Sequence, residues 1–204
     1  VGMHPIPIVH GLTVGELAQM INGEGWLDGK RKCELEIIKL KSYTHQTSYT
    51  LPIKPSPNLP NQQSVLLYPS TCLFEGTVLS VGRGTQHPFE WIGHPDLKNQ
   101  PFQFTPISIE GMAKKPPHEN SVCFGVDLSK EKTGREISLK YFIQLYKRFP
   151  DKEKFFIPYF DKLAGTKLLK EQIKKGMTEK QIKATWKKDL DMYKVMRKKY
   201  LIYS

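Results

Sequence analysis

Residues 121–149 read SVCFGVDLSKEKTGREISLKYFIQLYKRF, and the hydrophobic pattern changes within this stretch. SVCFGVDL at 121–128 is a short apolar run that is typical of a strand. From Ser138 onward, apolar residues return every three or four positions, as they do on one face of a helix. Strand candidates precede this stretch and helical patterns follow it. The order predicts an α+β fold of mixed strands and long loops followed by a C-terminal helical segment.

The helical segment begins with a helix at 138–149, which Ser138 caps and Pro150 ends. A short helix follows near 159–164, and a third at 166–175 is closed by Gly176. The last helix opens at 178, where Thr178 and Gln181 form a capping box, and it runs on through Trp186 and Tyr193 as one piece.

Strands, loops and one further helix are predicted before residue 121. FQFTPISI at 102–109 is a strand candidate, and residues 76–101 are predicted as loops. A helix capped by Asn61 is expected over 62–74, with Pro69 breaking or kinking it. Four prolines make residues 50–61 an extended loop.

The N-terminal part carries one more helix and one more strand candidate. Residues 12–22 are predicted to be a helix, because Thr13 and Glu16 form a capping box before an apolar face. Residues 33–43 alternate well enough for a strand, although the Ile37-Ile38 doublet interrupts the alternation and indicates a bulge.

Positive charge is concentrated at the C-terminal end. Residues 1–129 hold 10 Lys/Arg and 11 Asp/Glu, whereas residues 130–204 hold 21 and 9, so the net charge of +11 arises entirely in the last third. Such a segment can bind nucleic acid, anionic lipid or an anionic polymer, or form solvated helix faces. Eighteen of these residues are lysines, and the nearby aromatic residues have helical core spacing. We therefore favour solvated faces and expect no nucleic-acid binding.

Other general features limit the class of protein. With 39% hydrophobic residues and no apolar run of about 18, the chain is expected to be globular and without a transmembrane segment. Cys33, Cys72 and Cys123 are far apart, so neither a disulfide framework nor a zinc site is expected. The chain begins with Val1 and shows no leader, which suggests a piece of a longer protein.

The region 68–96 holds the residues best suited to chemistry. Glu75, Arg83 and Glu90 stand there among four glycines, and two carboxyl groups are what glycoside cleavage uses. Structural interpretations of the same residues remain open: Glu75 as a helix cap or the salt-bridge partner of Arg83, Glu90 as a surface residue, and the glycines as turns. The spacing of His87 and His94 does not indicate a metal site, and we expect no metal or cofactor.

Outside this region, His10 precedes the helix at 12–22, where a ligand-facing and a hydrogen-bonded structural histidine are both open interpretations. The serines and Cys72 lack the sequence context of a hydrolase nucleophile.

Five segments together resemble the NamZ family of exo-β-N-acetylmuramidases and occur in that family's order. They are PIPIVHGLTVGELA (5–18), SPNLPN (56–61), LLYPSTCLFEGTVLSVGRGTQHPFEWIGHP (66–95), CFGVDL (123–128) and KKYLIYS (198–204). The YPSTC and CFGVDL variants resemble the Bacteroidetes branch. The resemblance implies a periplasmic or exported hydrolase that releases terminal N-acetylmuramic acid from the non-reducing end of peptidoglycan fragments.

The resemblance also implies a two-part architecture. Family members have an N-terminal Rossmann-like domain and a smaller C-terminal α+β domain, with the active site in the cleft between them. This chain shows no counterpart of the N-terminal motifs, so residues 1–25 are expected to end that domain or link to the next, and residues 26–204 to form the C-terminal domain. The full-length protein is expected to be a glycosidase, whereas activity of this chain alone stays open.

The resemblance implies roles for individual residues. Arg83 would grip the lactyl carboxylate of muramic acid with two parallel hydrogen bonds, and Glu75 would be the proton donor or orient the substrate. Glu90 is the second catalytic candidate, and His10 would contact a sugar hydroxyl. Further substrate-binding candidates in the matching motifs are Ser56, Asn58, Thr85 and His94.

A non-catalytic alternative also fits the sequence. The basic helices would then form a binding module for peptidoglycan or another anionic cell-wall polymer. Binding of that kind weakens as ionic strength rises.

Overall fold

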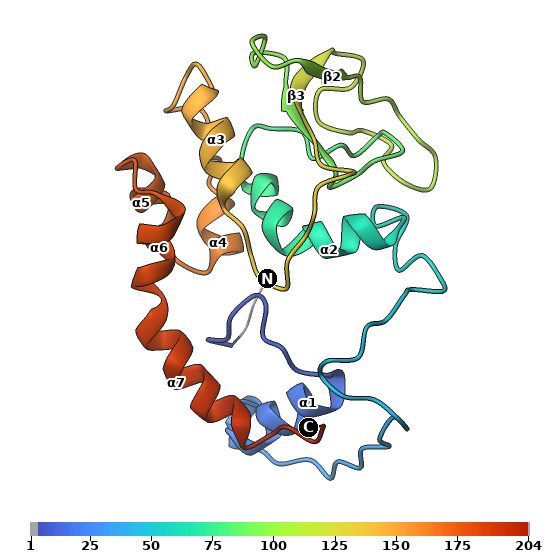
Figure 1. Cartoon of the computed structure of the whole chain (residues 1–204), viewed down its shortest axis with the longest axis vertical. Coiled ribbons are helices and arrows are strands. Elements are labelled where there is room, and N and C mark those ends of the chain that lie inside the picture. Colours follow the sequence, from blue (N-terminus) through green and yellow to red (C-terminus); the bar gives the residue numbers. More distant parts are fainter. Residues whose placement is uncertain (1–3, 204) are drawn as a thin grey trace. The chain divides into compact units, whose positions relative to one another are not determined.

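The computed structural model describes residues 4–203, which divide into two units (Figure 1). Unit 1 contains residues 50–182, and unit 2 combines residues 4–49 with residues 183–203. Helices and a small antiparallel sheet confirm the predicted α+β class. Among the described residues, no helix is long and apolar enough to cross a membrane.

The sheet belongs to unit 1 and has three short strands. β1 (Trp91–His94), β2 (Phe102–Phe104) and β3 (Cys123–Asp127) are all antiparallel, and β3 lies in the centre. The predicted strands at 102–109 and 121–128 are confirmed in shortened form. The prediction of a loop through 91–94 was wrong, because a four-residue strand containing a glycine gives too little alternation to detect.

Glycines allow the central strand to approach its neighbour. Gly93 and Gly125 are paired across β1 and β3. A Cβ atom on Gly125 would lie 1.8 Å from the Ile92 backbone oxygen, and one on Gly93 would lie 2.6 Å from the Phe124 oxygen. Neither position has room for a side chain.

Five helices complete unit 1, together with one 3₁₀ helix, η2. They are α2 (Gln62–Thr71), α3 (Lys140–Arg148), α4 (Phe160–Ala164), α5 (Leu168–Lys174) and α6 (Glu179–Thr185), the last of which continues into unit 2. Asn61 caps α2 as predicted, with its side chain accepting a hydrogen bond from the Ser64 N–H. Pro69 lies inside α2, which ends two residues later and continues as η2 (Cys72–Gly76).

Phenylalanines form the core of unit 1. The ring of Phe142 in α3 stacks on Phe74 in η2 at 4.7 Å between centroids, and it also contacts Phe155 and Phe160. Gly76 lies so close to α4 that a Cβ atom there would be 2.5 Å from the Phe160 Cα. This packing fixes η2, and therefore the backbone of Glu75, against α4.

Unit 2 is built from α1 (Val14–Gly23), a 3₁₀ helix η1 (Asp28–Lys30) and α7 (Lys187–Lys198). The capping box of Thr13 and Glu16 is present at the start of α1. The predicted single helix from residue 178 onward is interrupted at Trp186, so α6 and α7 are separate.

The predicted strand at 33–43 was wrong for this chain. These residues form neither a strand nor a helix. A strand requires a neighbour to take its backbone hydrogen bonds, and none of the described residues pairs with residues 34–39 in this way.

Candidate functional site

Glu75 and Arg83 form an ion pair in unit 1. The Arg83 Nη2 donates to Glu75 Oε1 at 2.8 Å, and the two side chains are 34% and 25% exposed. Glu75 is carried by η2, whereas Arg83 lies in the turn that follows it. A charge-assisted bond of this kind fixes the guanidinium while leaving part of it accessible to a ligand.

An aromatic pair supports the guanidinium. The Arg83 Cζ lies 5.2 Å from the centroid of the buried Phe89 ring, and Tyr68 packs edge-on against the same ring at 4.9 Å. Phe89 has a φ of 64°, which is unusual for a bulky residue and marks a strained backbone. Its N–H donates to the Val81 oxygen at 2.6 Å. The surrounding packing therefore holds Phe89 in the position that supports Arg83.

The glycines on either side of Arg83 form the turn itself. Gly82 and Gly84 have φ values of 74° and 81°, which non-glycine residues rarely adopt. A Cβ atom on Gly82 would lie 2.6 Å from the His87 oxygen, and one on Gly84 would lie 2.5 Å from the Ile107 oxygen. Protein backbone fills the space beside both glycines, so they are turn residues rather than points of ligand approach.

Glu90 is buried and contacts other protein groups through both carboxylate oxygens. Its Oε1 accepts a hydrogen bond from Asn61 Nδ2 at 2.6 Å, and its Oε2 lies 2.9 Å from His87 Nδ1. The His87 ring is partly exposed and stacks on Trp91 at 4.3 Å. Because a carboxylate oxygen accepts, this bond places a proton of His87 on Nδ1, and Nε2 is the ring nitrogen that is left for a ligand.

Two of the other candidates in unit 1 make local structural contacts. The Thr85 hydroxyl donates to the Gly82 oxygen at 2.7 Å and accepts from the His87 N–H at 3.0 Å. His94 Nδ1 accepts from the Asp96 N–H at 3.0 Å. Burial lowers the pKa of His94, and the nearby His118 lowers it further, so His94 is neutral at neutral pH.

Ser56 and Asn58 stabilise the proline-rich loop. The Ser56 hydroxyl accepts a hydrogen bond from the Asn58 N–H at 3.3 Å, and Asn58 Nδ2 donates to the Met112 oxygen at 2.9 Å. The Asn58 Oδ1 is buried and has no hydrogen-bond partner among the described residues. No contact joins this pair to Glu75 or Arg83 in the described part of the chain.

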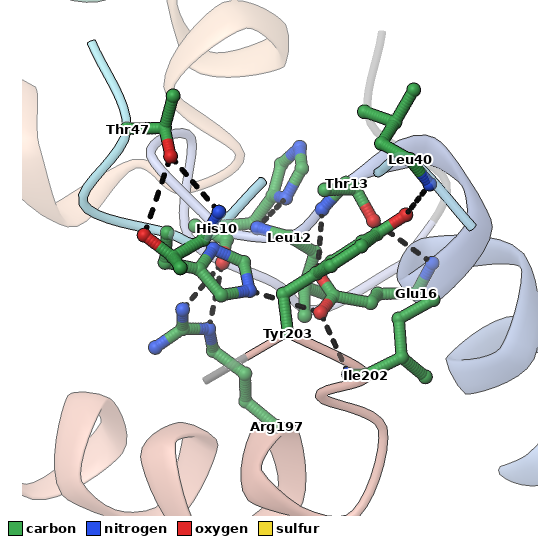
Figure 2. A network of polar contacts seen from close by, with 12 residues as sticks. His10, Leu12, Thr13, Glu16, Leu40, Thr47, Arg197, Ile202 and Tyr203 are labelled. Atoms are coloured by element: carbon green, nitrogen blue, oxygen red, sulfur yellow. Dashed lines mark hydrogen bonds and ion pairs between the residues drawn. The ribbon is translucent and has the colours of Figure 1, made fainter. Parts of the chain in front are cut away.

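His10 belongs to unit 2, where Figure 2 shows it beside Leu12 and Arg197. Its Nδ1 accepts a hydrogen bond from the Leu12 N–H at 3.1 Å, and Arg197 Nε donates to the Gly11 oxygen at 2.9 Å. Burial lowers the pKa of His10, and the positive charge of Arg197 lowers it further. The neutral ring thus has its proton on Nε2, which no described residue accepts.

Glu16 is the centre of the polar network in Figure 2 and is fully buried. Its Oε2 accepts from the Thr13 N–H at 2.7 Å, and its Oε1 accepts from the Ile202 N–H and from His45 Nε2, both at 2.9 Å. The predicted capping role of Glu16 is confirmed. The same carboxylate also joins the start of α1 to the chain after α7, which the sequence did not reveal.

The structure adds residues that the sequence did not indicate. Tyr68 and Phe89 support the ion pair, whereas Asn61 and His87 bind Glu90. Asn61 was recognisable only as a helix cap, because its second contact depends on the tertiary fold. A cavity of about 80 Å³ lies elsewhere in unit 1, between α2, α3 and the segment 128–138, and none of the candidate residues lines it. No group of three or more His, Cys, Asp or Glu in residues 4–203 is arranged to hold a metal ion.

Two family models match the chain. The model described as exo-β-N-acetylmuramidase NamZ, C-terminal, matches residues 66–203, and its N-terminal counterpart matches residues 1–63. A curated relative, the peptidoglycan β-N-acetylmuramidase NamZ of Bacillus subtilis strain 168, is 35% identical. The match covers the whole of this chain and 53% of the relative, so the chain spans about half of that protein's length.

Solved structures from Bacteroides fragilis NCTC 9343 have the same fold. A DUF1343 family protein is 49% identical with a TM-score of 0.95, and the match covers all of this chain and 59% of that protein. A second DUF1343 protein is 23% identical with a TM-score of 0.78 and the same coverage, and it supports the fold alone.

Proposed function

The chain belongs to the NamZ family of exo-β-N-acetylmuramidases, and from this premise we propose that it is the C-terminal part of a peptidoglycan-directed glycoside hydrolase. The proposed reaction releases terminal N-acetylmuramic acid from the non-reducing end of peptidoglycan fragments. We place this chain on one wall of a cleft whose other wall is the N-terminal domain of the family. Peptidoglycan lies outside the cytoplasmic membrane, so the proposal includes export.

The observation that carries the proposal is the partly exposed Arg83 guanidinium. It has five N–H donors, and the Glu75 bond is its one hydrogen bond to the described residues. N-acetylmuramic acid differs from N-acetylglucosamine by a lactyl ether, which carries a carboxylate. A guanidinium that is held in place and still has free donors suits a planar carboxylate better than an ammonium group would.

Glu75 and Glu90 are the proposed carboxyl groups of the reaction, and the difference between their environments supports different tasks for them. Glu75 is partly exposed, so we propose it as the proton donor or, through its bond with Arg83, as the group that orients the guanidinium. Glu90 is buried and acts through His87, whose Nε2 is the group available for proton transfer. We therefore propose Glu90 as a positioning residue for His87.

The remaining substrate-binding candidates stay proposals of lower rank. His10 has an Nε2–H available for a sugar hydroxyl. Thr85, His94, Ser56 and Asn58 already use polar atoms in local hydrogen bonds, and the buried Asn58 Oδ1 has no hydrogen-bond partner among the described residues.

The wall-binding alternative rests on the lysine-rich helices. Several of these lysines are paired within the chain, including Lys170 with Asp161, Lys174 with Glu153 and Lys187 with Asp191. Pairing reduces the charge available to an anionic polymer, and therefore the enzyme proposal is preferred.

Substrate selectivity tests the role of Arg83. The assay compares kcat/KM for chromogenic β-glycosides of N-acetylmuramic acid and N-acetylglucosamine. The protein is a fusion in which the N-terminal region of the 49% identical B. fragilis relative is joined before Val1 of this chain. Arg83→Lys should lower the preference for muramic acid by about tenfold or more, because a bidentate bond is lost. Arg31→Lys, at an exposed position in unit 2, is the control. Unchanged selectivity in Arg83→Lys would show that Arg83 does not bind the lactyl group.

A further inference from the structure

The backbone of residues 34–39 in unit 2 forms no hydrogen bond with the residues that the structure describes. Both of its ends are fixed. Cys33 N–H donates to Asn22 Oδ1 at 3.1 Å, its oxygen accepts from Asn22 Nδ2 at 2.9 Å, and Leu40 N–H donates to the Tyr203 hydroxyl at 3.0 Å. The segment is thus held in place while its own hydrogen-bonding groups remain available.

Charged and apolar side chains are mixed in this segment, and its apolar residues Ile37, Ile38 and Leu40 point in two directions. Ile37 packs on α1, where its Cγ2 would lie 2.8 Å from a Cβ atom on Gly15. Ile38 and Leu40 are 90% and 61% exposed. Neighbouring residues in a strand point to opposite faces, so Ile37 is covered by α1 whereas Ile38 and Leu40, on the other face, are not. Glu34 and Glu36 share the face of Ile38 and Leu40, so the apolar part of that face is its C-terminal end.

We propose that residues 34–40 are a β-strand of a sheet that is completed by the N-terminal region of the family. The segment lies in the part of the chain that matches the N-terminal family model, and the relatives extend far beyond the length of this chain. A bare backbone edge recruits another strand through main-chain hydrogen bonds. The face that carries Ile38 and Leu40 then packs against the same region. The inference rests on family membership and not on the catalytic roles proposed above.

Hydrogen exchange measured by mass spectrometry tests this proposal. Amides 34–39 should exchange at nearly the rate of unstructured peptide in the 204-residue chain. In the fusion that carries the B. fragilis N-terminal region before Val1, they should exchange at least about 100-fold more slowly, because the sheet must open first.

Matched variants identify the face involved. Ile38→Lys in the fusion should lower the protection of residues 34–39 by about tenfold or more, since it removes the burial of a large apolar side chain. Val195→Lys changes a 71%-exposed residue on α7 in the same way and should leave the protection unchanged.

Several outcomes would overturn the proposal. The first is fast exchange of residues 34–39 in a fusion whose α1 and α7 amides are protected. The second is an equal effect of the two lysine variants on that protection. The third is protection in the 204-residue chain that rises with protein concentration, which would assign the edge to a second copy. If the fusion does not fold, the full-length B. fragilis protein provides the measurement, and fast exchange in its aligned segment contradicts the proposal. Protection without glycosidase activity would refute the proposed function only.

Discussion

Replacing Glu16 with glutamine should destabilise unit 2 because the carboxylate accepts three hydrogen bonds in a fully buried position. Oε2 accepts from the Thr13 N–H at 2.7 Å, and Oε1 accepts from the Ile202 N–H and His45 Nε2 at 2.9 Å each. An amide has a single acceptor oxygen. Its best orientation keeps two of the donors satisfied and turns the NH₂ group toward the third donor, the Thr13 N–H.

The expected loss in the free energy of unfolding is about 2–4 kcal/mol. A hydrogen bond to a charged group contributes about 1.5–3 kcal/mol, and a buried donor left without an acceptor costs about 1–3 kcal/mol. These two contributions overlap, so the total lies below their sum. Glu34→Gln, at an exposed position of the same unit, should change the free energy of unfolding by less than about 0.5 kcal/mol.

The pH dependence gives the prediction a second readout. Burial raises the pKa of Glu16, but the hydrogen bonds from Thr13, Ile202 and His45 outweigh it, and the pKa lies below its ordinary value. The carboxylate therefore stabilises the fold above the unfolded-state pKa of about 4.3, and this contribution is lost as the pH falls through the lower folded-state pKa. Glu16→Gln should flatten this acid limb.

Urea unfolding followed by far-UV circular dichroism measures the free energies between pH 3 and pH 7, roughly the range in which carboxylates titrate. Amide exchange in α1 reports on unit 2 specifically. If Glu16→Gln were as stable as Glu34→Gln at neutral pH, or showed an unchanged acid limb, the carboxylate would not be the anchor that the structure indicates.

Two further predictions concern packing and thiol reactivity. Gly125→Ala should destabilise unit 1 by about 3 kcal/mol or more, because its Cβ would lie 1.8 Å from a backbone oxygen of β1. Gly134→Ala, whose Cβ would have its nearest atom at 3.8 Å, should be tolerated. Equal melting temperatures of the two variants would contradict this prediction. Burial raises the pKa of Cys72 to about 11 and that of Cys123 to about 12. A thiol reagent at pH 8 should therefore modify the exposed Cys33 alone until urea is added. Modification of all three cysteines in the native chain, detected by mass spectrometry, would contradict this prediction.

Local signals predicted much of the fold correctly. Capping residues define the starts of α1 and α2, and helical spacing locates α3, because both signals depend on residues within a few positions of one another. β1 was missed because its pairing with β3 joins residues thirty or more positions apart. Residues 33–43 have the pattern of a strand, but no strand in the described part of the chain pairs with them.

The candidate site was predictable in its residue types more than in its contacts. The possible salt bridge between Glu75 and Arg83 could be named from their proximity in the sequence, and the structure contains it. The contact between Asn61 and Glu90 joins a helix cap to a buried carboxylate 29 positions away, and no local pattern indicates such a pair. The strained φ of Phe89 is likewise a product of tertiary packing.

Release of a chromogenic leaving group from a β-N-acetylmuraminide tests the central proposal most directly. The 204-residue chain is measured alone and as the fusion with the N-terminal region, each with Glu75→Gln beside it. We expect the fusion to turn over the muraminide, and we expect Glu75→Gln to lower this turnover by about 100-fold or more. A loss of that size is typical when a general acid is removed. A fully active Glu75→Gln fusion would remove Glu75 from the chemistry. A folded fusion with no turnover of the muraminide would contradict the proposed function itself.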